Sequence, residues 1–316
     1  MSVEIITPKT REEWLIERHK TVGSSETPAL LGISPFKDDT PLSLFYRKRA
    51  QIDLRSEMTR ALRRGLLMED DALSILQDDH PDWTITPNPP AGGKFFRDLS
   101  DGISCTPDAF IEAPGRPRGI CQVKTVNKFS FKRAWLTDGG DIEPPLYVAV
   151  QAVQDASLTG AEWAIILAMV MDDELDTFEV EVPIHAGLIG RIKSEARKFW
   201  DDVKAGHPPA ADYSRDGDVI AALYPPKHDL PPIDLSSDNV LPEIVAEREE
   251  LMARTRVDEK RKKEIDAEIA EKLSGHSIGT LADGTRILRT MQERNYKARD
   301  AYTISFPQIK IKRAAA

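Results

Sequence analysis

Three residue types that can act together on a phosphodiester lie close in one stretch of the chain. Asp108 stands beside an apolar run at 106–111, and Gln122 and Lys124 lie two apart in the next run, at 120–124. A turn rich in Gly and Pro separates the runs, which predicts a hairpin of two strands. Because side chains alternate along a strand, Gln122 and Lys124 point to the same face. The hairpin therefore brings Asp108, Gln122 and Lys124 into one small volume.

This combination suits metal-assisted hydrolysis. A carboxylate and a second oxygen ligand can hold Mg²⁺, and a neighbouring cation can help activate a water against a phosphodiester. The motif alone is short, because a polar strand residue followed by a lysine is common. An exposed edge hairpin without catalytic function is the alternative that the same residues allow.

Two helices must flank this hairpin if it is a site. A predicted helix at 56–76 carries Glu69, four residues after Gly65. Taken alone, Glu69 reads equally as a solvated helical acid. A second predicted helix, at 146–158, carries Gln151 and Gln154, and its register leaves open which glutamine faces the hairpin.

The order of these motifs resembles the PD-(D/E)xK nuclease core. RecB-type nucleases place a Gly-x-x-x-Glu helix before the Pro-Asp strand and a glutamine helix after it. The segments Trp14-Leu15-x-x-Arg18, Gly23-Ser24-Ser25-Glu26 and Leu30-Leu31-Gly32-Ile33-Ser34-Pro35-Phe36 narrow the resemblance to the YqaJ-type viral recombinase family. This chain departs from the pattern at Gln122, where the family usually has Asp or Glu.

The resemblance implies a fold and an activity. The fold would be α/β, with a restriction-endonuclease-like central mixed sheet flanked by helices and a site along one sheet edge. The activity would be that of an Mg²⁺-dependent exonuclease, with Mn²⁺ as a substitute, that degrades the 5′-ended strand from duplex DNA ends. The remaining 3′ single strand would pass to an annealing protein. Related enzymes form ring-shaped trimers, which implies a homo-oligomer here.

The resemblance also implies roles for individual residues. Asp108 would be the central metal ligand, Glu69 would hold a second ion, and Lys124 would orient the attacking water. Gln122 would offer a neutral amide oxygen, which binds metal more weakly than a carboxylate. The remaining candidates are the Val123 carbonyl as a metal ligand, and Arg18, Ser25, Gln151, Gln154 and Lys128 as DNA contacts. Basic runs that could meet phosphates are Arg47-Lys48-Arg49, the arginines at 60, 63 and 64, and Lys128, Lys132 and Arg133.

Composition limits the alternatives. The chain has 316 residues and a net charge of −9, which argues against a protein that coats DNA but allows a local basic channel. Cys105 and Cys121 are expected to be buried packing residues, which fits a reducing cytoplasm and not a zinc site. No apolar run is long enough for a membrane span, and residues 1–18 lack the apolar core of a signal peptide. With the resemblance, this predicts a phage or prophage protein in the cytoplasm of a bacterial host.

The composition changes along the chain in a way that predicts three parts. Residues 1–206 form the nuclease core, residues 207–240 form a Pro-rich connection, and residues 241–316 form an extension. The extension begins with a charged helix at 241–273 and continues with a small sheet around an Asp283-Gly284 turn. Two rival functions remain open: a structure-specific or single-strand nuclease on the same core, and a catalytically impaired protein that binds DNA ends.

Overall fold

The computed structural model describes residues 3–50, 60–172, 175–227 and 229–291, and they form two compact units. The first unit is Met1–Pro225 and the second is Pro226–Ala316. The first unit thus continues beyond the boundary at 206 that the Pro-rich composition suggested. It contains all the candidate site residues.

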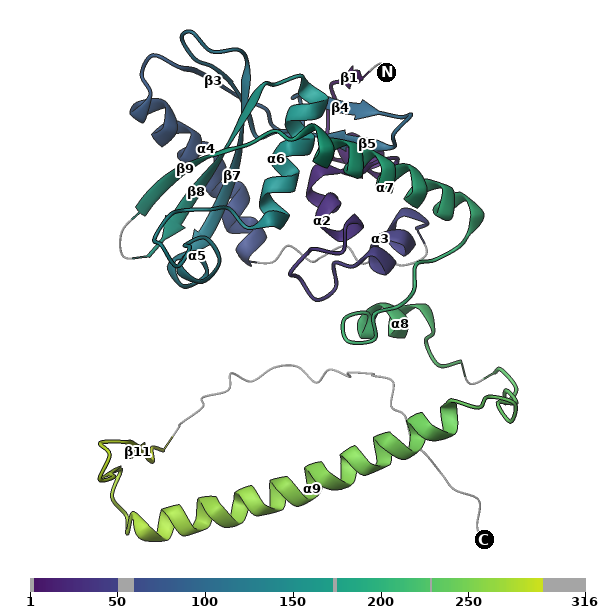
Figure 1. Ribbon diagram of the computed structural model, residues 1–316, viewed down its shortest axis with the longest axis vertical. Coiled ribbons are helices and arrows are strands. Elements are labelled where there is room, and N and C mark those ends of the chain that lie inside the picture. Colours follow the sequence, from purple (N-terminus) through teal and green to yellow (C-terminus); the bar gives the residue numbers. More distant parts are fainter. Residues whose placement is uncertain (1–2, 51–59, 173–174, 228, 292–316) are drawn as a thin grey trace. The chain divides into compact units, whose positions relative to one another are not determined.

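A five-stranded mixed sheet is the centre of the first unit (Figure 1). Its only parallel pair joins two long neighbouring strands, and the helix α6 (Leu146–Thr159) connects them. The other pairs are antiparallel, including the hairpin predicted from residues 106–124. In sheet order the strands are β3 (Thr84–Pro87), β6 (Ala109–Glu112), β7 (Gly119–Asn127), β8 (Trp163–Met171) and β9 (Leu175–Val182).

Helices cover both faces of this sheet because the central strands are apolar on both sides. On one face, Leu73 and Leu76 of α4 (Arg60–Asp79) pack against Cys121 and Val123. On the other face, α6 and the short helix α5 (Lys128–Ala134) pack against alternate residues such as Ile120. The α/β class expected from the motifs is confirmed. The strand period also assigns Gln122 and Lys124 to the α6 face, since they alternate with Cys121 and Val123.

A second, four-stranded sheet holds the N-terminal segment beside the core. Residues 95–112 contribute to both sheets: β6 lies in the five-stranded sheet, and the two strands before it belong to this one. Its order is β1 (Glu4–Ile6), β4 (Phe95–Asp98), β5 (Ile103–Cys105) and β2 (Val22–Gly23). Around it lie α1 (Arg11–His19), the 3₁₀ turn η1 (Ser24–Glu26), α2 (Thr27–Leu30), α3 (Pro41–Lys48) and α7 (Ala186–Ala205). Cys105 and Cys121 are both free and buried, as expected.

The first unit ends with a helix that the sequence placed in a connection. Val219 of α8 (Gly217–Leu223) is fully buried against Leu42 of α3. Tyr46, Ala211 and Leu223 complete this small cluster. Burying such a contact keeps the segment on the core, which explains why the unit extends to Pro225.

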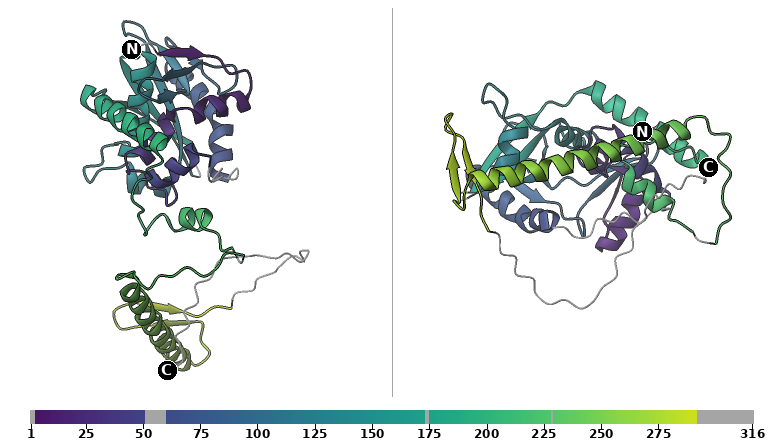
Figure 2. Two further views of the ribbon diagram at one scale, coloured as in Figure 1. Left: turned by 90° about the vertical axis from the view of Figure 1, so that its right-hand side faces the viewer. Right: turned by 90° about the horizontal axis from the view of Figure 1, so that it is seen from below.

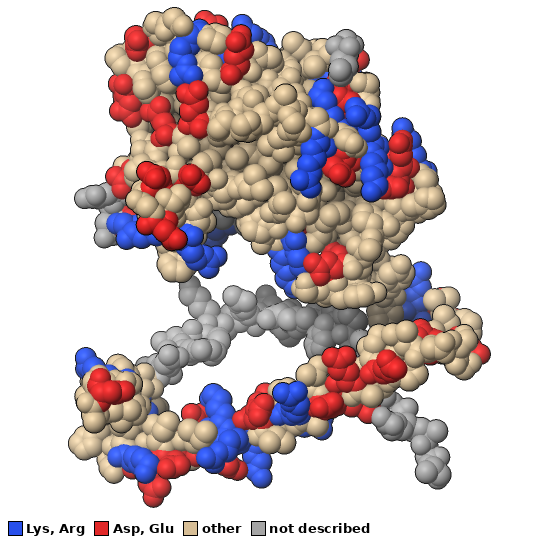
Figure 3. Space-filling view, in the orientation of Figure 1, with Lys and Arg blue, Asp and Glu red and all other residues tan. Residues whose placement is uncertain are grey.

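In its described residues, the second unit consists of one long helix followed by a hairpin (Figure 2). The helix α9 (Leu241–Lys272) and the pair β10 (Ile278–Thr280) and β11 (Arg286–Leu288) confirm the predicted charged helix and small sheet. Acidic and basic side chains are interspersed along α9 (Figure 3). Among the described helices of the chain, none combines the length and the apolar character that a membrane span needs.

Candidate active site

The site begins where β6 and β7 separate. Their ladder pairs Ala109 with Cys121, and Asp108 N–H donates to the Cys121 carbonyl at 3.2 Å. The residue before it is Pro107, which has no N–H to continue a ladder. Within the described residues, β7 has no strand partner on this side beyond Cys121. The Val123 N–H instead donates to Asp108 Oδ2 at 2.7 Å. The site therefore lies along the edge that β7 exposes where it outruns β6.

Gln122 and Lys124 lie on one face of β7, as the alternation predicted. Lys124 Nζ donates to Gln122 Oε1 at 2.9 Å, and Gln122 is 5% exposed. Burial raises the pKa of the Asp108 carboxyl, whereas the Lys124 charge, the Val123 N–H and the Gln122 side chain oppose that rise. The three residues of the predicted motif therefore form one electrostatic unit.

Glu69 approaches these three residues from α4, the helix on the other face of the sheet. One turn before it, Gly65 lies so close to β7 that a Cβ there would be 3.7 Å from Thr125 Oγ1. Burial is the main cause that raises the pKa of Glu69 to about 7, and the negative charge of Asp108 adds to it. The Lys124 charge acts in the other direction. Two carboxylates that disfavour each other's ionised form are thus held at one place, although they come from different elements.

This donor set fits a hard divalent cation. Asp108 and Glu69 supply charged oxygens, and the Gln122 amide and the Val123 carbonyl supply neutral ones, which are ligand types that Mg²⁺ accepts. A cation between the two carboxylates would relieve the repulsion that raises the pKa of Glu69. Among the described residues, no group of three or more His, Cys, Asp and Glu side chains is arranged to hold a metal. The site is therefore poorer in charge than an all-carboxylate centre.

Asp155 is a buried acid of this region that the sequence reasoning missed. It lies on α6 with 0% exposure. Burial raises its pKa to about 7 and the negative charge of Asp108 adds to the rise, whereas the Ser24 side chain opposes it. Its position four residues after Gln151 was the signal that could have marked it, because residues four apart share a helix face.

Asn88 is a second residue that the sequence did not single out. Its side-chain amide donates to the carbonyls of Pro107 and Lys94, both at 3.0 Å. Its backbone N–H donates to the Asp108 carbonyl at 2.9 Å. Asn88 therefore fixes the backbone that carries Asp108, from the loop after β3.

The predicted contacts to a DNA end lie together on the N-terminal segment. Arg18 Nη2 donates to Ser25 Oγ at 2.7 Å, and the guanidinium lies 5.0 Å from the centre of the Trp14 ring. Ser25 is exposed and Arg18 is partly exposed. The pair presents a cation and a hydroxyl side by side, a combination that can bind a phosphate.

The two candidate glutamines of α6 are placed differently. Gln154 is 1% exposed, and its Nε2 donates to the carbonyls of Val22 and Ser104, so it braces the second sheet against α6. Gln151 is 8% exposed and donates only locally, to the Tyr147 carbonyl at 2.9 Å. The register that the sequence left open therefore favours Gln151 as the residue available to a ligand.

Two of the basic candidates are already engaged. Lys128 is exposed and pairs with Asp172 at 2.5 Å. Lys48 belongs to a basic run that the sequence suggested could contact phosphates. Its side chain is only 2% exposed and pairs with Glu26 at 2.7 Å, so it does not face solvent. Burial alone would raise the pKa of Glu26, but mainly the Lys48 charge, with that of Arg18, lowers it to about 2. Lys48 thus holds the segment that carries Ser25.

Comparison with known proteins gives one stretch of sequence similarity and several similar structures. No protein-family model matches the chain. An alkaline exonuclease from Laribacter hongkongensis is similar with a TM-score of 0.49 and 18% identity, over 62% of this chain and 94% of that one. A phage-related exonuclease from Haemophilus somnus is similar with a TM-score of 0.41 and 16% identity, over 59% of this chain and 96% of that one.

The sequence similarity is to the uncharacterized protein YqaJ of Bacillus subtilis (strain 168). The two are 38% identical over 61 residues, which is 19% of this chain and 18% of YqaJ. The chain therefore matches less than a fifth of the length of this relative. Over that stretch, the predicted resemblance to the YqaJ-type recombinase family is confirmed.

Proposed function

We propose that the chain is a metal-dependent exonuclease that degrades the 5′-ended strand of duplex DNA from its ends. The product would be a 3′ single-stranded tail for homologous recombination of the phage type. The observation that carries the proposal is the set of contacts where β6 begins. The Val123 N–H donates to Asp108, Lys124 donates to Gln122, and the charge of Asp108 raises the pKa of Glu69.

Each residue has a proposed role in phosphodiester hydrolysis. Asp108, Glu69, Gln122 and the Val123 carbonyl would hold Mg²⁺, with Mn²⁺ as a substitute. The bound ion would polarise the phosphate and lower the pKa of a water. Lys124, whose charge acts on both carboxylates, would orient that water and stabilise the added negative charge on the phosphate.

The choice of strand would come from the N-terminal segment. Arg18 and Ser25 would bind the terminal 5′-phosphate, and Gln151 would contact the strand beside the metal. Lys128 would reach phosphates only by exchanging its partner Asp172. A homo-oligomeric ring and an annealing protein as partner belong to the same proposal, and they rest on the family resemblance.

Linear duplex DNA labelled separately at its 5′ and 3′ ends tests this function. With Mg²⁺ or Mn²⁺, the 5′ label should be released from linear DNA, whereas closed circular DNA should stay intact. Asp108→Ala should abolish release. Asp78→Ala, the same change at an exposed position of α4, is the matched control and should retain it.

A second candidate follows from the Gln122–Lys124 hydrogen bond. If that bond holds both side chains away from a metal, the chain would bind DNA ends without cutting them. Retained end binding with no release in either metal would favour this candidate. Release from circular or single-stranded DNA at an equal rate would instead favour a structure-specific or single-strand nuclease.

A further inference from the structure

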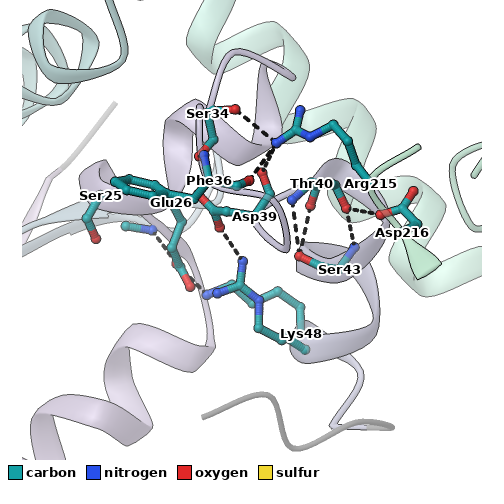
Figure 4. A network of polar contacts seen from close by, with 12 residues as sticks. Ser25, Glu26, Ser34, Phe36, Asp39, Thr40, Ser43, Lys48, Arg215 and Asp216 are labelled. Atoms are coloured by element: carbon teal, nitrogen blue, oxygen red, sulfur yellow. Dashed lines mark hydrogen bonds and ion pairs between the residues drawn. The ribbon is translucent and has the colours of Figure 1, made fainter. Parts of the chain in front are cut away.

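An arginine from the end of the first unit holds a loop at its beginning. Arg215 Nη2 donates to the carbonyls of Ser34 at 2.9 Å, Phe36 at 2.7 Å and Asp39 at 3.3 Å. Figure 4 shows the guanidinium over the turn formed by these carbonyls. One nitrogen therefore binds three carbonyls of the loop 34–39, which precedes Arg215 by more than 170 residues in the sequence.

Neighbouring contacts fix the same loop at its end. Asp216 accepts from the Thr40 hydroxyl at 2.5 Å and from the Asp212 N–H at 2.7 Å. Asp39 pairs with Arg47 of α3 at 3.0 Å. Thr40 and Asp216 are both about 1% exposed, so these bonds are protected from water. Buried hydrogen bonds of this kind hold a single loop conformation.

The loop presents an exposed aromatic ring. Phe36 is 62% exposed, which is unusual for a side chain whose backbone is held so firmly. Its ring meets the edge of Tyr147 with centres 6.0 Å apart and planes at 78°. Only one part of the Phe36 ring is covered in this way.

Tyr147 begins a line of side chains that leads to the site. Tyr147, Gln151 and Asp155 are four residues apart on α6 and therefore share one face. Gln151 donates to the Tyr147 carbonyl, and Asp155 is near enough to Asp108 for their charges to interact. Two steps of four residues correspond to about 12 Å along a helix. Phe36 therefore lies at the outer end of a face whose inner end meets the catalytic carboxylate.

We propose that Phe36 is a base-stacking contact for the DNA strand that enters the site, and that Arg215 is the residue that positions it. Exposed aromatic rings beside basic residues bind bases of single strands by stacking, without regard to sequence. This inference rests on the proposed action on DNA ends and adds the residues that grip the strand. It also gives the segment 211–223 a purpose, since that segment supplies the hold on the loop.

The test measures base stacking without hydrolysis. Duplex DNA with 2-aminopurine in a short single-stranded 5′ end is titrated with the full chain in EDTA, and the fluorescence change gives both contact and affinity. The wild-type protein should quench the fluorescence. Phe36→Ala should lose the quenching and bind about 5- to 100-fold more weakly, the range expected for loss of one base stack. Phe36→Trp should restore quenching.

Arg215→Met separates positioning from charge. It should weaken binding like Phe36→Ala, and the double variant should be no weaker than either single variant, because both changes remove one contact. The dependence of affinity on salt should keep its slope, since no phosphate contact is lost. Arg191→Met, which removes the same charge from an exposed position of α7, should bind like the wild type. Nucleotide release below saturating DNA should fall in Phe36→Ala and Arg215→Met and should be retained in Arg191→Met.

Several outcomes would overturn the proposal. Wild-type affinity and quenching in Phe36→Ala would exclude the stacking contact. Additive losses in the double variant, or a reduced salt slope in Arg215→Met, would exclude the positioning role. If Arg215→Met does not fold, the results for Phe36→Ala and Phe36→Trp still decide the stacking contact. Quenching without release by the wild type in any metal would reject the nuclease function and leave the stacking surface standing.

Discussion

At the scale of single residues, the neutral amide of Gln122 sets the charge of the site. Its oxygen accepts a hydrogen bond from Lys124, so Lys124 is held by an amide instead of a carboxylate. Asp108 and Glu69, the carboxylates proposed as ligands, would then carry the attraction for a divalent cation, and the charge of Asp108 already disfavours the ionised form of Glu69. The site should therefore bind Mg²⁺ weakly, because affinity for hard cations follows the number of charged oxygens.

Replacing Gln122 by glutamate tests this argument. Gln122→Glu should retain or raise nuclease activity at low Mg²⁺ and lower the Mg²⁺ concentration for half-maximal release by about tenfold. That is the effect of one added carboxylate worth about 1.4 kcal/mol. The measurement is a titration of activity with Mg²⁺. Asn127→Asp, which adds a carboxylate at the exposed end of the same strand and keeps an acceptor for the Ser130 N–H, is the matched control. A correctly folded Gln122→Glu variant that loses activity would contradict the ligand role.

The raised pKa of Glu69 predicts how metal-free stability depends on pH. Its folded pKa of about 7 lies above the usual glutamate pKa of 4.5, so between these values the native state holds more protons than the unfolded state. The free energy of unfolding should therefore fall as the pH rises through this window. Thermal unfolding of the wild type and of Glu69→Gln from pH 5 to 8 measures this dependence. The free energy of unfolding of the variant should fall less steeply with pH.

Mg²⁺ should act in the opposite direction in the same experiment. A cation binds the deprotonated carboxylates, so the rise in Tm on adding Mg²⁺ should be larger at pH 8 than at pH 6. Glu69→Gln should lose most of that rise. An equal rise in both proteins would show that the metal binds elsewhere.

At the scale of elements, the buried pair Glu26–Lys48 joins η1 to α3. Lys48 Nζ also donates to the carbonyls of Arg18 at 3.0 Å and Thr21 at 2.7 Å, so one ammonium holds the N-terminal segment in three places. Burial disfavours both charges, and each is tolerated because the other is present. This cross-link keeps Ser25 and Arg18 in position.

Removing one partner should be costly. Lys48→Met should lower the free energy of unfolding by about 3–5 kcal/mol, because the Glu26 charge is left buried without a cation. Lys37→Met breaks the exposed pair with Asp218 and should change the free energy of unfolding by less than about 1 kcal/mol. Urea unfolding measures both. A small effect of Lys48→Met would mean that Glu26 takes up a proton or reaches water.

The elements that the sequence predicted are those with local signals. The β6–β7 hairpin and α6 follow from turn residues and apolar periods, and Asp108, Gln122 and Lys124 follow from the hairpin. The roles of Asn88 and Lys48 depend on partners that are 19 and 22 residues away, and no local pattern marks them. Asp155 looked like an ordinary polar helix position. Its burial is known only once α6 is placed against the sheet.

At the scale of the whole molecule, the boundary of the first unit is set by contacts that composition hides. The prolines at 208 and 209 indicate a connection, yet the polar residues after them bind the loop 34–39, and Val219 fills a gap beside Leu42. A Pro-rich segment with charged residues reads as a linker because its partners lie near the other end of the chain. The hairpin and the charged α9 form the second unit because their contacts are mostly with each other.

Two truncations test where the first unit ends. A chain ending at 225 should keep the Tm of the first unit and the proposed activity on DNA ends, because every described contact of α8 is retained. A chain ending at 206 loses the burial of Val219 and the bonds of Arg215 and Asp216, roughly 3 kcal/mol in total. Its Tm should fall by roughly 6–12 °C, as expected for a domain of this size. Calorimetry of both chains decides, and equal Tm values would place the boundary at 206, with the contacts of Arg215 contributing nothing to the stability of the core.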